Sequence, residues 1–280
     1  METWNPTDEE YHAHFGLGSG DVKRLSHSIS DYLRGQNFKS TPATEFGALC
    51  HILLFEPQRL YEIYEVVDTD RITKKLRDEY PGKIILKPKV LREAYKTIGI
   101  LPTIPGLIRA TKEAPLKAEY NGICLKAKCD AVDFDTHTIF DYKTIAEGNL
   151  SGVVRGYGIH DIGWDMQAYH YKLVYHLSTG VPMDKIKFIF LVSIKSSFEP
   201  LAIKWDSEIE VEQKHIFALG NYEKFLHRYN FTQKNVNFDV TDPTHFLKHG
   251  LMCYTAGSNG FDQASRNRFK KANGEVSHVG

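Results

Sequence analysis

The stretch EYNGICLKAKCDAVDFDTHTIFDYK, which runs from Glu119 to Lys143, sets the organisation of the chain. Asn121-Gly122 lies between two runs with strand character, and this dipeptide predicts a two-residue type I′ hairpin turn in which both central residues have positive φ. The second strand is predicted from Ile123 to about Phe134, and after another turn a third strand is predicted over Thr138–Thr144. The sequence therefore predicts three adjacent strands joined as a meander.

The acidic residues of this stretch are predicted to converge on one patch of the sheet. Residues two apart on a strand point to the same face, so Asp141 and Lys143 share a face. Asp130 lies near the end of the neighbouring strand, and Glu119 lies on the strand before it. Such a cluster is costly if it is buried and unpaired, whereas a divalent cation bound between the acids removes their repulsion. Oxygen ligands favour Mg²⁺ or Mn²⁺ over zinc, and Lys143 is then left to hold a water or to stabilise charge on a phosphate.

An isolated D-x-K pattern has a simpler interpretation. Exposed strand faces often carry Asp and Lys as cross-strand ion pairs. The pattern gains weight from the acid one hairpin upstream and from a helix predicted downstream, on which Gln167 and Tyr171 lie one turn apart on a single face. That pair could position a phosphate or an attacking water, or could be half-buried polar residues packed on the sheet.

Three motifs in this order resemble a known nuclease family. Asp130 followed by Asp141-Tyr142-Lys143 resembles the PD-(D/E)XK nuclease signature, D-x(n)-(D/E)-x-K. Gln167-Ala168-Tyr169-His170-Tyr171 matches the Q-x-x-x-Y motif of its exonuclease branch. Thr41 to Pro57, TPATEFGALCHILLFEP, resembles the helix that carries a metal-binding histidine in exonuclease VIII. The resemblance spans roughly residues 18 to 194, and it extends to the group of phage lambda exonuclease.

The resemblance implies an α/β fold of the restriction-endonuclease type, with a mixed central sheet flanked by helices. It implies a metal site formed by His51, Asp130 and Asp141, which the carbonyl of Tyr142 is able to join. Without the resemblance, a lone histidine on a helix is more often structural. Glu119 is expected to bind a second metal or to hold a metal-bound water. The expected catalytic residues are Glu119, Asp130, Asp141, Lys143, Gln167 and Tyr171.

The resemblance also implies contacts with DNA. In the family, a helix near the start of the domain lies beside the DNA end, which makes Arg24 and Ser26 candidates, although a solvated helix face is the alternative interpretation of both. The full set of expected DNA-binding residues is Arg24, Ser26, Thr144, Arg155, Gln167 and Tyr171.

Length and composition indicate a globular cytoplasmic protein. A chain of 280 residues is long enough for one sizeable domain, and its hydrophobic content of 42% is ordinary for a globular protein. Lys+Arg and Asp+Glu are equal at 35 each, so any nucleic-acid-binding surface must be local. No apolar run is long enough to span a bilayer, and the polar, acidic N-terminus does not resemble a secretory signal. The four cysteines lack metal-binding spacing, which suits a reducing cytoplasm.

The domain organisation predicted from the sequence is one nuclease domain with short additions. A leader is predicted over residues 1–17 and the domain over residues 18–256. Within the domain, residues 59–110 are predicted to be a variable insertion and residues 207–229 an accessory C-terminal helix. Residues 257–280 are rich in Gly, Ser and Asn with several basic residues, and are predicted to be a disordered basic tail.

Together, the site residues and the resemblance predict a Mg²⁺-dependent exonuclease that degrades linear double-stranded DNA from its ends, with Mn²⁺ as a substitute metal. The resemblance implies 5′→3′ digestion, a role in phage-type recombination, a single-strand annealing protein as partner and a homo-oligomeric ring around the duplex. No membrane association is expected. Two alternatives remain: a structure-specific or nicking endonuclease of the same fold, and a catalytically inactive DNA-binding module.

Overall fold

The computed structural model of the 280-residue chain is built on a mixed five-stranded sheet with the strand order β3-β4-β5-β6-β7. It describes residues 4–34, 41–69, 71–146, 152–153, 159, 163–195, 200–206, 209–228 and 230–235. The strands are β3 (Thr111–Tyr120), β4 (Ile123–Asp133), β5 (Thr138–Ile145), β6 (Lys187–Ile194) and β7 (Leu201–Trp205). Within this sheet the β5–β6 pair is parallel, and the other neighbouring pairs are antiparallel.

The predicted meander is confirmed as β3, β4 and β5. Asn121 and Gly122 have φ values of 51° and 78°, as a type I′ turn requires. The turn places Tyr120 opposite Ile123, and this register continues along the two strands. The second turn ends at His137, whose φ is also positive at 52°.

The parallel strand β6 is reached by a crossover that contains helix α11 (Trp164–Thr179). Two strands that run in the same direction need a long crossover connection of this kind, because a tight hairpin turn joins only antiparallel strands. Helix α11 ends at Gly180, whose φ of 76° provides a left-handed C-cap. Strand β6 is almost wholly apolar, as expected of a strand that is covered on both faces.

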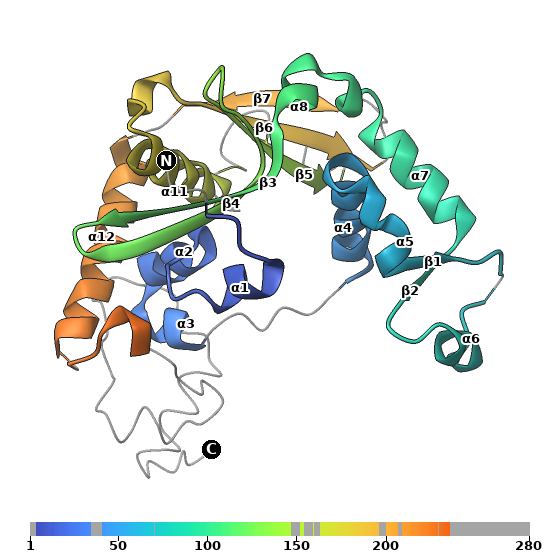
Figure 1. The fold of residues 1–280 in the computed structure, drawn as a ribbon, viewed down its shortest axis with the longest axis horizontal. Coiled ribbons are helices and arrows are strands. Elements are labelled where there is room, and N and C mark those ends of the chain that lie inside the picture. The colour runs from blue at the N-terminus through green and yellow to red at the C-terminus, as the bar shows by residue number, and fades with distance from the viewer. Residues whose placement is uncertain are drawn as a thin grey trace, which may run out of the picture.

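Helices cover both faces of the sheet (Figure 1). A separate cluster of buried hydrophobic residues lies on each face. On one face lie α2 (Ser19–His27), α3 (Ile29–Arg34), α11 and α12 (Ile209–Arg228). On the other lie α4 (Pro42–Phe55), α7 (Pro88–Ile98) and α8 (Pro105–Arg109). The predicted mixed sheet flanked by helices is therefore confirmed, and α12 lies within the range predicted for a C-terminal helix.

The segment predicted to be an insertion packs beside α4. Its remaining elements are η1 (Pro57–Arg59), α5 (Leu60–Ile63), β1 (Tyr64–Val66), α6 (Lys74–Glu79), β2 (Ile84–Leu86) and η2 (Leu101–Thr103). Strands β1 and β2 pair in parallel as a small separate sheet. The last short elements of the described chain are η4 (Met183–Lys185) and η5 (Gln233–Asn235).

The residues predicted to be a leader lie against β4. They include α1 (Asp8–Ala13), and the backbone of Leu17 exchanges hydrogen bonds with Cys124 and Lys126 at 3.0 and 2.9 Å. The buried ammonium of Lys126 also donates to the carbonyls of Tyr11 and His14, at 2.7 Å each. The predicted basic tail, residues 257–280, lies outside the described residues. Among the described helices, none combines the length and apolar character needed to cross a membrane.

Candidate metal centre

The candidate site lies where strands β4 and β5 separate. The two strands pair from Asp133↔Thr138 to Ala131↔Phe140, so Asp130 and Asp141 occupy the next positions, where regular pairing ends. The backbone N–H of Tyr142 donates to Oδ2 of Asp130 at 2.7 Å. A carboxylate side chain thus satisfies a backbone donor at this point, and that bond holds Asp130 at the fork between the strands.

Glu113 on β3 supplies a second carboxylate opposite Asp130. The β3–β4 register pairs Lys112 with Ala131 and Ala114 with Cys129, which leaves Glu113 and Asp130 as the facing positions between them. Glu113 has a positive φ of 49°, a conformation that few residues other than glycine adopt. Its carboxylate nevertheless lies at the fork, with Oε1 3.3 Å from Nε2 of His51.

Helix α4 brings a histidine to the two acids. Its N-terminus is capped as predicted, because Oγ1 of Thr41 accepts from the N–H of Thr44 at 3.2 Å and Pro42 occupies the first turn. Gly47 allows the helix to approach β5 closely, since a Cβ added there would lie 2.8 Å from Oγ1 of Thr144. His51 follows one turn later and points to the fork.

His51, Glu113 and Asp130 form a cluster with the dimensions of a metal site. Nε2 of His51 lies 3.3 Å from Oε1 of Glu113 and 3.3 Å from Oδ1 of Asp130. The three ligand atoms all lie within 4.8 Å of one another. Oε1 of Glu113 is buried and accepts no hydrogen bond from the described part of the chain. Two carboxylates and one imidazole aimed at a common point suit a single divalent cation, which would give this oxygen a partner.

Asp141 lies beside this cluster in a polar group with Lys143 and Gln167. Oδ2 of Asp141 is 2.7 Å from Nζ of Lys143, and Oδ1 accepts from Nε2 of Gln167 at 2.9 Å. Nζ of Lys143 in turn donates to Oε1 of Gln167 at 3.0 Å. Each of the three side chains contacts the other two, so α11 fixes the orientation of the lysine relative to β5.

The electrostatics of the site favour an added positive charge. Burial raises the pKa of Asp141 to about 6, with the neighbouring charge of Asp130 acting in the same direction and Lys143 opposing it. Burial also raises the pKa of Glu113, despite the opposing charges of His51 and Lys128. Two of the acids therefore hold protons more tightly than an exposed carboxyl does. A cation bound here would take the place of those protons.

His51 and Asp130 stabilise each other's charged forms. Burial by itself would lower the pKa of His51, but the hydrogen bond to Asp130 and the charges of Asp130, Glu113 and Glu56 outweigh it, so the pKa is raised. Burial by itself would raise the pKa of Asp130, but the hydrogen bond and charge of His51, with Lys143 and the amide of Tyr142, lower it. A proton on Nε2 occupies the position that a metal ion would take.

Of the metal ligands that the resemblance implies, the structure brings His51 and Asp130 together. Asp141 lies beside them with Lys143 and is not one of the three clustered residues. Tyr142 contacts the site through its backbone N–H, which donates a hydrogen bond to Asp130. The expected placement of Glu119 has to be corrected. Glu119 is exposed, faces Cys124 beside the hairpin turn, and lies six positions along β3 from Glu113, or about 20 Å.

Sequence reasoning missed Glu113, although the signal was present. A two-residue turn at Asn121-Gly122 fixes the register of the hairpin, and counting back from it places Glu113 opposite Asp130. Alternation along the strand could not identify this residue, because Glu113 and Glu119 are six positions apart and have the same parity, so only the register distinguishes which acid reaches the fork.

The remaining predicted residues have other surroundings. Tyr171 is buried in the core, with its ring 6.4 Å from that of Phe188, and burial together with the charge of Asp141 raises its pKa well above the ordinary value. Arg24 forms an ion pair with Asp21 at 2.5 Å, and the hydroxyl of Ser26 donates to the carbonyl of Lys23. Arg155 lies outside the described residues.

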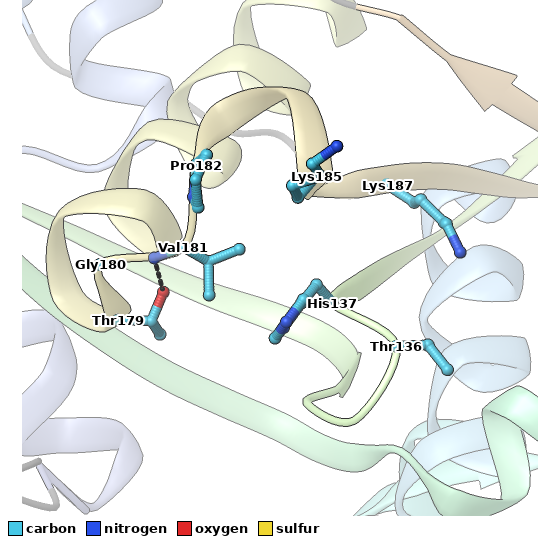
Figure 2. A pocket seen from close by; sticks show the side chains of 8 residues that line it. All are labelled: Thr136, His137, Thr179, Gly180, Val181, Pro182, Lys185 and Lys187. Atoms are coloured by element: carbon cyan, nitrogen blue, oxygen red, sulfur yellow. Dashed lines mark hydrogen bonds between the residues drawn. The ribbon is translucent and has the colours of Figure 1, made fainter.

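Two pockets differ in their relation to this site. The larger, with a volume of about 600 Å³, lies at the start of β5, between the turn containing His137 and the segment after α11 (Figure 2). Lys185 and Lys187 line it, and no acidic side chain is among its lining residues. The smaller, of about 220 Å³, is lined in part by Glu113 and therefore adjoins the cluster. Size alone would select the wrong cavity, because the acids lie at the smaller one.

Comparisons with known proteins identify the family and the fold. A family model described as "PDDEXK-like domain of unknown function (DUF3799)" matches residues 24–238. The crystal structure of a "Putative exonuclease" from Eubacterium rectale is similar, with a TM-score of 0.55 and 15% identity over 84% of this chain and 89% of that one. A second solved structure, 12% identical, has a TM-score of 0.31, which is too low to bear on the fold. No curated protein matches the chain.

Proposed function

We propose that this chain, which belongs to the family of PDDEXK-like domains, is a divalent-metal-dependent nuclease that hydrolyses DNA from the ends of linear duplexes. The observation that carries the proposal is the convergence of His51, Glu113 and Asp130 within 4.8 Å, beside a lysine held by Asp141. The similarity to the protein from Eubacterium rectale establishes the likeness of fold, and its description supports exonuclease activity as the first activity to test.

The residues of the site divide into two groups with different tasks. His51, Glu113 and Asp130 would hold the cation, with Asp141 adjacent to them. A divalent cation supplies Lewis acidity towards a phosphate oxygen and lowers the pKa of a bound water. An imidazole among carboxylates is compatible with Mn²⁺ as well as Mg²⁺, and we propose Mg²⁺ as the ion used in the cell.

Lys143 would act on the phosphate or on the attacking water. Its ammonium is oriented by Asp141 and by Gln167, and it lies 5.8 Å from the centre of the Trp164 ring, which limits its movement on that side. A positioned cation stabilises negative charge that develops on a phosphate during hydrolysis. Gln167 is therefore a positioning residue in this scheme, since it acts through Lys143 and Asp141.

The finer features of the proposal come from the family resemblance. They are digestion in the 5′→3′ direction, a role in phage-type recombination, a single-strand annealing protein as partner, and a ring of subunits around the duplex. A nicking or structure-specific endonuclease remains the second candidate, because the same site serves either reaction.

The test is digestion of end-labelled linear duplex and of closed circular DNA with Mg²⁺, Mn²⁺, Ca²⁺ or a chelator. We expect loss of the linear DNA alone, with Mg²⁺ or Mn²⁺. Cutting of the closed circle would favour the endonuclease, and intact DNA under every condition would refute the nuclease assignment.

Site variants connect the activity to the cluster. Asp130→Asn should reduce the rate by about 10³-fold, because it weakens metal binding and charge stabilisation together. Glu119→Gln is the matched control on the same sheet, and it should digest DNA at the rate of the unaltered protein. Equal activity of Asp130→Asn and the unaltered protein would show that the hydrolysis occurs elsewhere or comes from a contaminant.

A further inference from the structure

A second charged network lies directly beside the metal cluster. Lys128 is two positions before Asp130 on β4, so both residues belong to the same stretch of strand. Its Nζ lies 2.8 Å from Oε2 of Glu113 and 2.5 Å from Oδ1 of Asp8. One ammonium therefore links a carboxylate of the cluster to a carboxylate of the N-terminal helix α1.

Asp8 is held between two cations that come from different parts of the chain. Its Oδ1 contacts Lys128, and its Oδ2 accepts from the guanidinium of Arg59 at 3.2 Å. Arg59, in η1 directly after α4, also donates to Oε1 of Glu56 at 2.7 Å. Both carboxylate oxygens of Asp8 therefore contact a cationic side chain. The non-bridging oxygens of a phosphate could make the same two contacts with the lysine and the arginine.

The network lines the pocket of about 220 Å³ that adjoins the cluster, except for Arg59, which contacts the lining residues Asp8 and Glu56. Asp8, Glu56 and Glu113 provide three carboxylates in its lining, and Lys112 and Lys128 provide two ammonium groups. The nucleic-acid strand at a cation held by Glu113 would run past this pocket or into it, because only that one carboxylate separates Lys128 from His51.

The charge of this pocket depends on what Glu113 and Asp8 bind. With Asp8 facing inwards, its carboxylate occupies the contacts with Lys128 and Arg59 that an anion would need. A divalent cation at the cluster neutralises Glu113, and rotation of Asp8 out of the pocket removes a further negative charge. Both changes would weaken or remove the contacts of Lys128 with Glu113 and Asp8. Arg59 would lose its contact with Asp8 and keep its bond to Glu56. A phosphate would then take the place of the Asp8 carboxylate.

Asp8 is able to leave without unfolding the segment that carries it. Its side chain is 50% exposed and lies in the first turn of α1. The contacts that fix the segment to β4 come later in the chain, at the carbonyls of Tyr11 and His14 and at Leu17. A change of side-chain rotamer at Asp8 is therefore sufficient.

We propose that Lys128 and Arg59 bind a backbone phosphate of the DNA strand next to the metal cluster, and that Asp8 occupies this phosphate position when DNA is absent. The inference rests on the proposed function, because it assigns a substrate contact to the same site. It assigns to α1 the role of a built-in competitor of the substrate.

Binding measurements test the competition directly. Fluorescence anisotropy of a labelled duplex is recorded in Ca²⁺, with gels to confirm that the DNA stays intact. Asp8→Asn should strengthen binding several-fold, and Lys128→Gln should weaken it about tenfold. In the Lys128→Gln background Asp8→Asn should bring no gain, since the competing contact no longer exists.

Glu9→Gln separates this competition from a general effect of charge. Glu9 is an exposed acid next to Asp8 on the same helix, so its substitution removes an equal charge from the same surface. An equal gain from Glu9→Gln, or an undiminished gain from Asp8→Asn in the Lys128→Gln background, would overturn the proposal. If Lys128→Gln fails to fold, the more exposed Arg59→Gln carries the same test.

A neutral phosphate substitute locates the contact. In a series of duplexes, each carries one methylphosphonate at a different backbone position. One position should weaken binding to the unaltered protein and have no effect on Lys128→Gln, a result that a purely structural role for Lys128 would not give. Identical profiles for the two proteins would overturn the assignment. Metal-dependent digestion by the unaltered protein, assayed separately, shows whether the proposed function itself holds.

Discussion

The protein places histidines in two sites that have opposite electrostatic character. His51 faces two carboxylates at the fork between β4 and β5, and its pKa is raised. His170 and His215 lie in the core between α11 and α12, joined at 3.0 Å through their ring nitrogens, and His170 also contacts the carbonyl of Lys126 at 3.0 Å. Burial lowers the pKa of His170 to about 4 and that of His215 to about 2.

The comparison shows that the surroundings of an imidazole decide its use. The core pair is neutral, and both ring nitrogens of His170 have partners, one in His215 and one in a backbone carbonyl, so the pair fixes how the two helices pack. His51 instead holds a proton between two acids, in a position where that proton competes with a metal ion. Substitutions at the two sites should therefore affect different properties.

The largest expected effect is the loss of activity on substitution of His51. His51→Gln should reduce metal-dependent DNA hydrolysis by about 10²- to 10³-fold, because the cation loses a ligand and the acids lose a neutralising partner. Single-turnover rates at saturating Mg²⁺ provide the measurement. Full activity of His51→Gln would contradict the assignment of His51 as a metal ligand.

The next expected effect is on the free energy of unfolding as the pH changes. Lowering the pH should destabilise the protein through His170 in the core and stabilise it through Asp141 beside the metal cluster. His170 has a folded pKa of about 4, below its ordinary value of 6.5, so the unfolded chain binds more protons between these values. Its contribution is present above pH 6.5 and is lost as the pH falls towards 4, by about 3 kcal/mol.

Asp141 acts in the opposite direction in metal-free protein. Its folded pKa of about 6 lies above the ordinary 3.8, so its contribution is present at low pH and is lost as the pH rises through 6. Urea denaturation in chelator between pH 7.5 and 4.5 gives the net result. Asp141→Asn should make the loss of stability below pH 6 steeper, and a shallower curve would contradict the assignment of the two signs.

A smaller effect on stability is expected at the core pair. His215→Ala should lower the free energy of unfolding by about 2–3 kcal/mol, since His170 loses its hydrogen-bond partner in a buried position. The folded fraction should hydrolyse DNA at the unaltered rate. His27→Ala, at an exposed position on α2, is the control and should leave the stability within about 0.5 kcal/mol. Loss of activity without loss of stability would remove the distinction between the two regions.

The smallest effect is a change in the approach of α4 to β5. Gly47→Ala places a methyl group 2.8 Å from the hydroxyl oxygen of Thr144, so His51 should shift and activity should fall about tenfold. Removing that hydroxyl with Thr144→Ala should restore most of the rate. Gly220→Ala in α12, where nothing lies within 4 Å, is the matched control and should stabilise the protein by about 0.5–1 kcal/mol.

Local patterns predicted the parts of the structure that depend on neighbouring residues. The turn at Asn121-Gly122 was evident because its backbone conformation admits few other dipeptides. Thr41-Pro42 marked the start of α4 because capping preferences act within a single turn. The mixed sheet and the family followed from these elements together with the spaced motifs, and both are confirmed.

Contacts between distant segments were beyond such patterns. The pairing of His170 with His215 depends on how two helices pack, and the contact of Asp8 with Lys128 depends on where α1 meets β4. Glu113 occupies an intermediate position, since the hairpin register determined its place but strand alternation did not. The acids on β4 and β5 were identified because their strands are adjacent and their order is fixed by the chain.

The backbone of Glu113 has a consequence for the evolution of this site. A left-handed conformation costs a residue with a side chain about 1–2 kcal/mol, and glycine would avoid that cost. Glu113→Gly should therefore relax the strand while it removes a carboxylate from the fork. A change towards a less strained backbone at this position would therefore cost the proposed site one of its carboxylates.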